Sequence, residues 1–199
     1  MANDTSEKLL NVAEALFAER GFYGVSIAAI AAELDITKQA LLHHFKSKEK
    51  LYGAVLARIS SDFETSQQNV LLNEPDPIQR ITQFLERLAL PSEENVRRTR
   101  LLMRELLDNN QRADHAEHWY LKGFLNQLAA MVADVPGRKN ANPNDNLALV
   151  YHWLGAVNYF LVSMPTLNAI IGKARFEQLA KDQSAYLSVL VRATLPNEG

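Results

Sequence analysis

The chain contains no cysteine among its 199 residues. Disulfide cross-links, thiolate nucleophiles and cysteine-based zinc sites are therefore excluded. It also lacks any run approaching 18 uninterrupted apolar residues, and its N-terminus is polar and acidic where a signal peptide would carry basic residues before an apolar run. We expect a cytoplasmic protein without a membrane segment.

No stretch alternates apolar and polar residues for long enough to predict a β-strand. Apolar residues instead recur at helical spacing, and at 47% hydrophobic content the chain can bury one ample core or two modest ones. The predicted fold class is therefore all-α. The clearest expected helices are Ser6–Arg20, Pro77–Leu90, Glu93–Asn109, Ala113–Val135, Leu147–Val162 and Lys173–Leu195, with an exposed linker over residues 136–145.

Residues 26–50 contain two short helical patterns with almost nothing between them. Ser26 can cap the first pattern, Asp35 and Ile36 form the turn, and Thr37 can cap the second. The inward-facing residues are Ile27, Ile30, Ala31 and Leu34 in the first pattern, and Leu41 and Phe45 in the second. Ser47 can cap a long helix that continues well past this head, to about residue 73. This arrangement is typical of a helix-turn-helix that reads DNA.

If Leu41 and Phe45 face inward, the other side of the second short helix is offered to the DNA major groove. Gln39 can make two hydrogen bonds to adenine, and the thymine methyl group suits an apolar side chain such as Leu42. We expect Lys48 to bind a phosphate beside the start of the long helix. The predicted DNA-binding residues are Ser26, Thr37, Lys38, Gln39, Leu42, His43, His44, Lys46 and Lys48.

The net charge of −2 does not by itself indicate a nucleic-acid partner. The distribution of charge does, because Glu49 is the only acidic residue between Ile36 and Lys50, against four lysines and two histidines. A cluster of a few lysines is also common on a solvated surface. The order of the helical patterns, caps and charges together favours DNA binding.

The segment Leu147–Val162 is apolar on nearly every side, so it must be buried on two faces. The last helix carries one apolar stripe, and both helices could pair with their copies in a four-helix bundle. We therefore expect a homodimer. The predicted dimer-interface residues are Leu154, Val157, Leu161, Phe176, Leu179, Gln183, Leu187, Leu190 and Val191.

Large aromatic and methionine side chains in the second half of the chain suit an adaptable apolar cavity for a small-molecule effector. Ordinary core packing is the alternative for each of them. The predicted effector-pocket residues are Met103, Leu106, Trp119, Tyr120, Phe124, Met131, Tyr151, Trp153, Asn158, Tyr159 and Phe160. A buried Asn158 amide would need a partner, which a ligand or a neighbouring helix could provide.

Neither a metal site nor an enzyme is predicted. His115 and His118 could share one helix face near Asp114, but a third ligand such as His152 is distant in the sequence, so surface or capping histidines are the favoured interpretation. The chain has no glycine-rich phosphate loop and no serine-centred elbow. No cofactor is expected.

The first 55 or so residues resemble the DNA-binding domain of the TetR family of bacterial transcriptional regulators. The matching residues are Ala13, Leu16, Phe17, Gly21, Phe22, Ser26, Ile30, Ala31, Leu34, Ile36, Thr37, Leu41, His44, Phe45, Lys46, Lys48 and Leu51. The resemblance implies a recognition helix over Thr37–His44 with Lys48 on a phosphate. It also implies an all-helical C-terminal domain, dimerisation through the last two long helices and an effector pocket.

The chain departs from the family pattern in two respects. Leu42 stands where the family usually has an aromatic residue, typically tyrosine, and the family often has a basic or polar residue near Ala28 and Ala29. Both changes remove groups that could reach phosphate, so fewer backbone contacts are expected.

Together these observations predict an N-terminal three-helix helix-turn-helix DNA-binding domain over residues 1–52, followed by a larger helical effector-binding and dimerisation domain over residues 53–199. The expected function is a ligand-responsive transcriptional regulator, a repressor, that binds a palindromic operator in double-stranded DNA as a homodimer and responds to a small, largely apolar effector. The alternative is a helix-turn-helix dimer that acts without an effector, as an architectural or protein-binding module.

Overall fold

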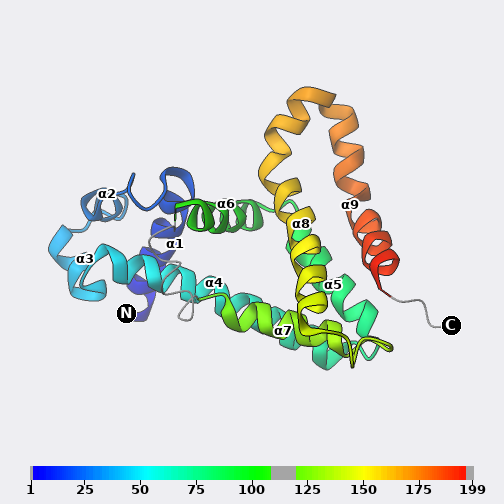
Figure 1. The fold of residues 1–199 in the computed structure, drawn as a ribbon. Coiled ribbons are helices and arrows are strands. Elements are labelled where there is room, and N and C mark those ends of the chain that lie inside the picture. Colours follow the sequence, from blue (N-terminus) through cyan, green and yellow to red (C-terminus); the bar gives the residue numbers. More distant parts are fainter. Residues whose placement is uncertain (1, 109–119, 196–199) are drawn as a thin grey trace. The chain divides into compact units, whose positions relative to one another are not determined.

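The structure, a computed structural model, describes residues 2–108 and 120–195. Over these ranges every regular element is a helix (Figure 1), which confirms the predicted all-α fold class. In chain order the helices are α1 (Ala2–Arg20), α2 (Ile27–Ala32), α3 (Lys38–Phe45), α4 (Lys48–Asn73), α5 (Pro77–Ala89), α6 (Glu93–Asp108), α7 (Lys122–Ala133), α8 (Pro143–Ile171) and α9 (Lys173–Thr194).

The largest difference from the sequence-based prediction concerns α8, which was expected over 147–162. The helix begins four residues earlier because Asn142 caps it, with its Oδ1 accepting from the backbone N–H of Asn144 at 2.9 Å, and Pro143 occupies the first turn. It also continues through Pro165 to Ile171. Proline removes one backbone hydrogen bond but has a φ compatible with a helix, so the chain tolerates it here.

The chain divides into two compact units. The first contains Met1–Ser61 and Arg97–Leu121, and the second contains Asp62–Val96 and Lys122–Gly199. Helices α4 and α6 therefore each run from one unit into the other. The first unit therefore also contains part of α4 and most of α6, and the predicted domain boundary after residue 52 stays a prediction.

The head of the first unit is held together by a small apolar core rather than by long helices. Leu9, Phe17, Ile30 and Leu41 are fully buried there. The Tyr52 ring packs edge-on against Phe17, with ring centroids 4.9 Å apart. Since α2 and α3 are too short to be stable alone, this core fixes their positions.

The core of the second unit lies where α5, α8 and α9 meet. Val157 and Leu161 of α8 and Leu187 of α9 are buried in one cluster with Ala89 and Phe160. The indole N–H of buried Trp153 donates to Thr194 Oγ1 at 3.0 Å, which ties α8 to the end of α9. One side of α8 therefore packs into the protomer's own core.

In the segment predicted to be an exposed linker, residues 136–145, the Arg138 side chain is held by hydrogen bonds to α8. Arg138 donates from Nε and Nη2 to Oδ1 of Asn146, at 3.0 and 2.8 Å, and Asn146 is buried. The last three residues of the predicted linker belong to α8 instead.

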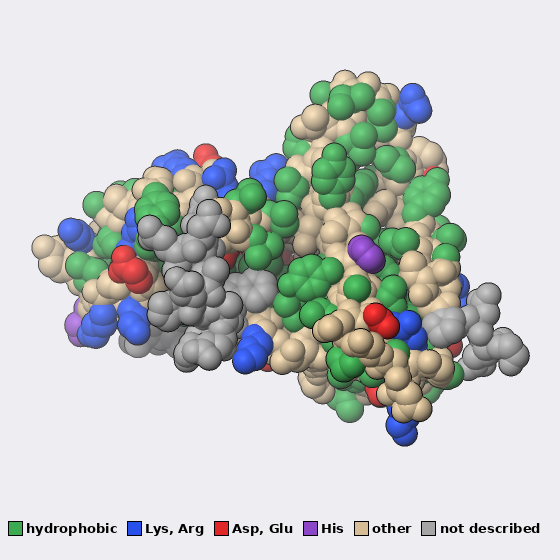
Figure 2. All heavy atoms as spheres, in the orientation of Figure 1, with side chains coloured by type: hydrophobic (Ala, Val, Ile, Leu, Met, Phe, Trp, Pro, Cys, Tyr) green, Lys and Arg blue, Asp and Glu red, His purple; other side chains and the backbone are tan. Residues whose placement is uncertain are grey.

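The opposite side of α8 is exposed and apolar. Tyr151 is 57% exposed and Tyr159 is 78% exposed, and Figure 2 shows hydrophobic side chains gathered over α8 and α9. By length and composition alone α8 could span a membrane. The same properties are expected of a helix that packs against protein on both sides.

Candidate DNA-binding site

The turn between α2 and α3 is set by backbone hydrogen bonds. The N–H groups of Leu34 and Ile36 both donate to the carbonyl of Ala31, at 3.2 and 3.1 Å, so the chain reverses tightly after α2. Asp35 adopts a φ of 52°, in the left-handed region that aspartate tolerates better than most residues. The turn brings α3 directly against α2, as the sequence predicts for a helix-turn-helix.

The outward side of α3 carries most of the predicted DNA-binding side chains. Leu41 is fully buried, and the opposite side of the helix is solvent-facing. The exposed residues of the predicted set are Ser26, Thr37, Lys38, Gln39, His43, His44 and Lys46. Leu42 and Lys48 are half-buried. The face therefore offers hydrogen-bond donors and acceptors of the kind that read base edges.

Two hydroxyl groups hold the starts of the short helices. Ser26 Oγ accepts from the backbone N–H of Ala29 at 3.0 Å, and Thr37 Oγ1 accepts from that of Ala40 at 3.1 Å. The predicted caps are confirmed. Because each oxygen is used as an acceptor, the hydroxyl hydrogen is still able to donate to a phosphate.

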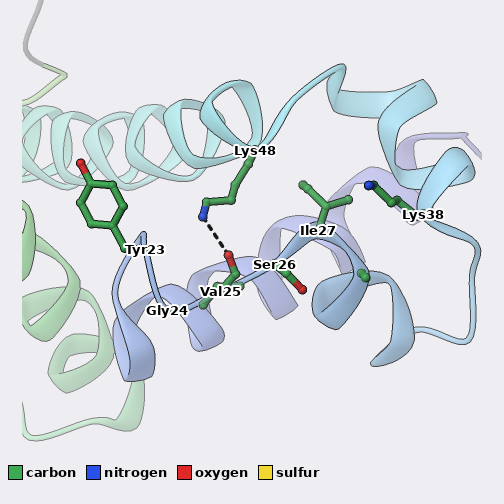
Figure 3. A pocket seen from close by; sticks show the side chains of 8 residues that line it. Tyr23, Gly24, Val25, Ser26, Ile27, Lys38 and Lys48 are labelled. Carbon is green, nitrogen blue, oxygen red and sulfur yellow. Dashed lines mark hydrogen bonds between the residues drawn. The ribbon is translucent and has the colours of Figure 1, made fainter.

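An open cavity of about 480 Å³ lies between the loop after α1 and the starts of α3 and α4. It is lined by Tyr23, Gly24, Val25, Ser26, Ile27, Ala28, Lys38 and Lys48. Figure 3 shows Lys48 reaching from α4 toward the loop, with Lys38 at the other end of the cavity. Two cationic side chains beside two helix starts form a surface that suits an anionic phosphate backbone.

Lys48 also has a partner inside the head. Its ammonium donates to the carbonyl of Val25 at 2.8 Å (Figure 3). The same ammonium lies 4.3 Å from the centre of the Phe22 ring. One hydrogen bond leaves two further N–H groups on the ammonium, so contact with phosphate is compatible with this geometry. Lys48 thus joins the start of α4 to the loop that carries Ser26.

Sequence reasoning missed the loop side of this cavity. Tyr23 is 72% exposed beside Gly24 and was predicted only as part of a connection. The contact of Lys48 with Phe22 and Val25 joins residues more than twenty positions apart, and no local spacing signals it. The one available hint is the presence of two aromatic residues, Phe22 and Tyr23, in a short loop before a capping serine.

The predicted effector-pocket residues fall into different environments. Phe124, Met131, Trp153 and Phe160 are buried in the second unit. The others that the structure describes are less enclosed: Met103 and Asn158 are half-buried, and Leu106, Tyr120, Tyr151 and Tyr159 are exposed. Trp119 lies outside the described residues, as do His115 and His118. The pocket therefore stays a prediction.

A polar group that sequence reasoning missed lies among the aromatic side chains of the second unit. Gln67 of α4 is fully buried, and its amide donates to the carbonyl of Phe124 at 3.1 Å. Its Oε1 has no hydrogen-bond partner among the residues that the structure describes. The Phe124 ring lies 5.1 Å from that of Phe63 and 5.9 Å from that of Phe84, measured between centroids.

The predicted dimer-interface residues differ in how deeply they are buried within the protomer. Val157, Leu161, Leu187 and Val191 are almost completely buried within the protomer, so they cannot touch a second copy without opening the core. The remaining members are half-buried: Leu154, Phe176, Leu179, Gln183 and Leu190. The sequence pattern correctly predicted the apolar stripes on α8 and α9. It did not show that α8, α9 and α5 of the same chain cover one another's apolar residues.

The head is similar to a segment of known proteins. Residues 9–55 match the family model described as bacterial regulatory proteins, tetR family. The chain is 44% identical over 50 residues to the transposon Tn10 TetC protein of Escherichia coli, covering 25% of each. It is 34% identical over 80 residues to the HTH-type transcriptional regulator UidR of Escherichia coli K12, covering 40% of this chain and 37% of UidR. The matches thus span well under half the length of these relatives.

The whole fold is similar to that of solved regulators. A crystal structure of a transcriptional regulator from Rhodococcus sp. Rha1 superposes with a TM-score of 0.69 at 15% sequence identity, covering 95% of each chain. At that identity the similarity shows the fold alone, which has an N-terminal helix-turn-helix domain followed by a helical domain.

The cap at Thr37 can be tested by its effect on stability. Thr37→Ala removes the hydroxyl that accepts from Ala40, and we expect the free energy of unfolding, measured by urea denaturation, to fall by about 1 kcal/mol. Thr37→Ser keeps the hydroxyl and is the matched control, expected to stay close to the unchanged protein. Equal losses in both variants would show that the hydroxyl is not what holds the start of α3.

Proposed function

We propose that this chain is a transcriptional regulator of the TetR family that binds double-stranded DNA as a homodimer and responds to a small effector. Regulators of this family are DNA-binding proteins rather than enzymes, and they are typically dimeric and ligand-responsive. We propose repression of a palindromic operator as the mode of action and the cytoplasm as its location.

The observation that carries this proposal is the outward side of α3. Gln39 and His43 are exposed on the side opposite buried Leu41, and the caps at Ser26 and Thr37 present helix starts beside them. A short helix with this exposed face matches the way a recognition helix enters the major groove. Base contacts fall to Gln39, Lys38 and His43, with Leu42 against a thymine methyl group or a sugar.

Phosphate contacts are assigned first to Lys48 and the Ser26 hydroxyl, which line the open cavity near Val25. Lys46, His44 and the Thr37 hydroxyl, at exposed positions of the head, are assigned the same role. Phosphate contacts fix the position of a protein on the duplex without reading the sequence. The head needs them because its overall charge is not basic.

Dimerisation is assigned to the outward faces of α8 and α9. Tyr159 and Ile170 of α8 are 78% and 74% exposed, and Tyr186 and Val189 of α9 are 55% and 65% exposed. Large apolar side chains exposed on neighbouring helices of a single chain mark an interaction site. A second copy provides the same surface by two-fold symmetry, and the half-buried residues of the earlier prediction would border it.

The effector site is proposed in the second unit. Gln67 favours a ligand-responsive regulator over an effector-free module. Its buried amide oxygen has no hydrogen-bond partner among the described residues, and leaving such an oxygen unpaired costs folding free energy. A largely apolar effector with one hydrogen-bond donor would satisfy Gln67 Oε1 and pack against aromatic rings such as that of Phe124. The effector-free alternative requires that oxygen to be satisfied by water.

The DNA assignment is tested with a duplex that the full-length protein selects from a random-sequence pool. Lys48→Ala is expected to weaken binding about equally on all sequences and to lower the salt slope, the fall of log K with log salt concentration, by about 1. Lys122→Ala, on α7 of the other unit, is the charge-matched control and should change neither quantity. A loss of affinity with an unchanged slope would mean that Lys48 only holds the loop through Val25.

The dimer assignment is tested by sedimentation equilibrium. Tyr159→Asp would place an unpaired charge in the proposed interface, so dimerisation should weaken by roughly 3 kcal/mol or more. Leu72→Asp changes a side chain of α4 that is 80% exposed and serves as the control, expected to leave the dimer intact. A Tyr159→Asp protein that dimerises as tightly as the control would exclude this face.

A further inference from the structure

We propose that Phe22 is a positioning residue for DNA binding, because its ring and the carbonyl of Val25 hold the Lys48 ammonium where a phosphate can reach it. This inference rests on the proposed function and deepens it, since Phe22 would act through Lys48 and not by touching DNA. All three residues belong to the first compact unit.

Two contacts from the loop after α1 converge on the Lys48 ammonium. It donates to the carbonyl of Val25 at 2.8 Å, the bond drawn in Figure 3. It also lies over the Phe22 ring, 4.3 Å from the ring centre, where the negative face of the ring attracts a cation. An ammonium has three N–H groups, so these two contacts leave at least one for an anionic partner.

The partners of Lys48 hold it without neutralising its charge. The carbonyl and the ring are both uncharged, and within the described part of the chain Lys48 forms no ion pair with a carboxylate. Other cations of the same unit differ, because Arg58 and Arg97 donate to the buried carboxylate of Glu14 at 2.6 and 2.8 Å. The full charge of Lys48 is therefore left for a phosphate.

The Phe22 ring is itself held by its aromatic neighbours. The ring of Tyr52, one turn along α4 from Lys48, has its centroid 5.0 Å from that of Phe22. The Phe17 ring is stacked at 6.2 Å, and the Tyr23 ring lies edge-on at 5.3 Å. Contacts with several rings fix the orientation of Phe22, so the place that it offers to the ammonium is fixed as well.

Holding the ammonium in advance lowers the cost of binding DNA. A lysine side chain has many rotamers, and it loses this freedom when it is fixed on a phosphate. Contacts that exist before DNA arrives reduce that loss. Lys48 lines the open cavity of about 480 Å³, so the held ammonium is accessible to a phosphate. Phe22 is therefore expected to raise affinity for every duplex sequence alike.

The test is a double-mutant cycle in the full-length protein. Phe22→Leu removes the ring but keeps an apolar side chain, and Phe22→Tyr keeps the ring and is the matched control. Each substitution is made in the unchanged protein and in Lys48→Ala, and affinity for the selected duplex is measured at low salt, where binding is tightest. Phe22 is half-buried, so the leucine variant loses less packing than a variant at a fully buried position would.

We expect Phe22→Leu to weaken binding about 5-fold to 25-fold, because each of two heads loses a cation–π contact that contributes about 2-fold to 5-fold. In the Lys48→Ala protein the same substitution should leave affinity unchanged, since the cation that the ring holds is absent. Phe22→Tyr should bind as the unchanged protein does. Urea denaturation of each variant shows that it is folded under the binding conditions.

An equal loss of affinity in both backgrounds would overturn the inference, because Phe22 would then act only through the stability of the head. Tighter binding by Phe22→Leu would overturn it too, since the ring would be keeping the ammonium away from DNA. Should Phe22→Leu fold poorly, Phe22→Met, whose side chain is closer in volume to phenylalanine, takes its place in the cycle.

A measurement without DNA separates this inference from the proposed function. Protons above the face of an aromatic ring are shielded, so the Hε protons of Lys48 should resonate upfield of those of other lysines in the proton NMR spectrum. The shift should persist in Phe22→Tyr and disappear in Phe22→Leu. A Lys48 signal without this shift in the unchanged protein would contradict the inference. Failure of the unchanged protein to select any duplex would instead contradict the proposed function.

Discussion

The burial of Leu41 is the constraint on which the reading head depends. Full burial of a leucine side chain contributes roughly 1.5–3 kcal/mol, and α3 is too short to be stable without it. Once Leu41 points into the core, helical geometry forces Gln39 and His43 to the opposite side. The same contact that stabilises α3 therefore decides which side chains lie on the face proposed to read DNA.

The positions of the charged residues in this head matter more for binding an anionic partner than the net charge does. The first 52 residues are slightly acidic by count, yet one acidic side chain, Glu14, is buried and used between helices. The lysines near the starts of α3 and α4 lie around the open cavity, where helix dipoles add to their potential. A protein with a net charge of −2 can in this way offer a locally positive surface.

The sequence predicted the parts of the fold that depend on neighbouring residues. The caps at Ser26 and Thr37 are local features, and both are confirmed. The partners of Glu14, by contrast, are 44 and 83 positions away.

Helical spacing likewise identified apolar stripes on α8 and α9 but could not show that Val157 and Leu187 face the protomer's own core. The pocket prediction has the same weakness, because residue type does not distinguish packing from ligand contact.

If two copies of α3 enter the major groove at a fixed separation, guanine-N7 methylation footprinting on the selected duplex will detect both of them. We expect protection of major-groove guanines in two symmetric half-sites about one helical turn, or somewhat more, apart. Protection of a single site, or of no major-groove position while the protein is bound, would contradict it.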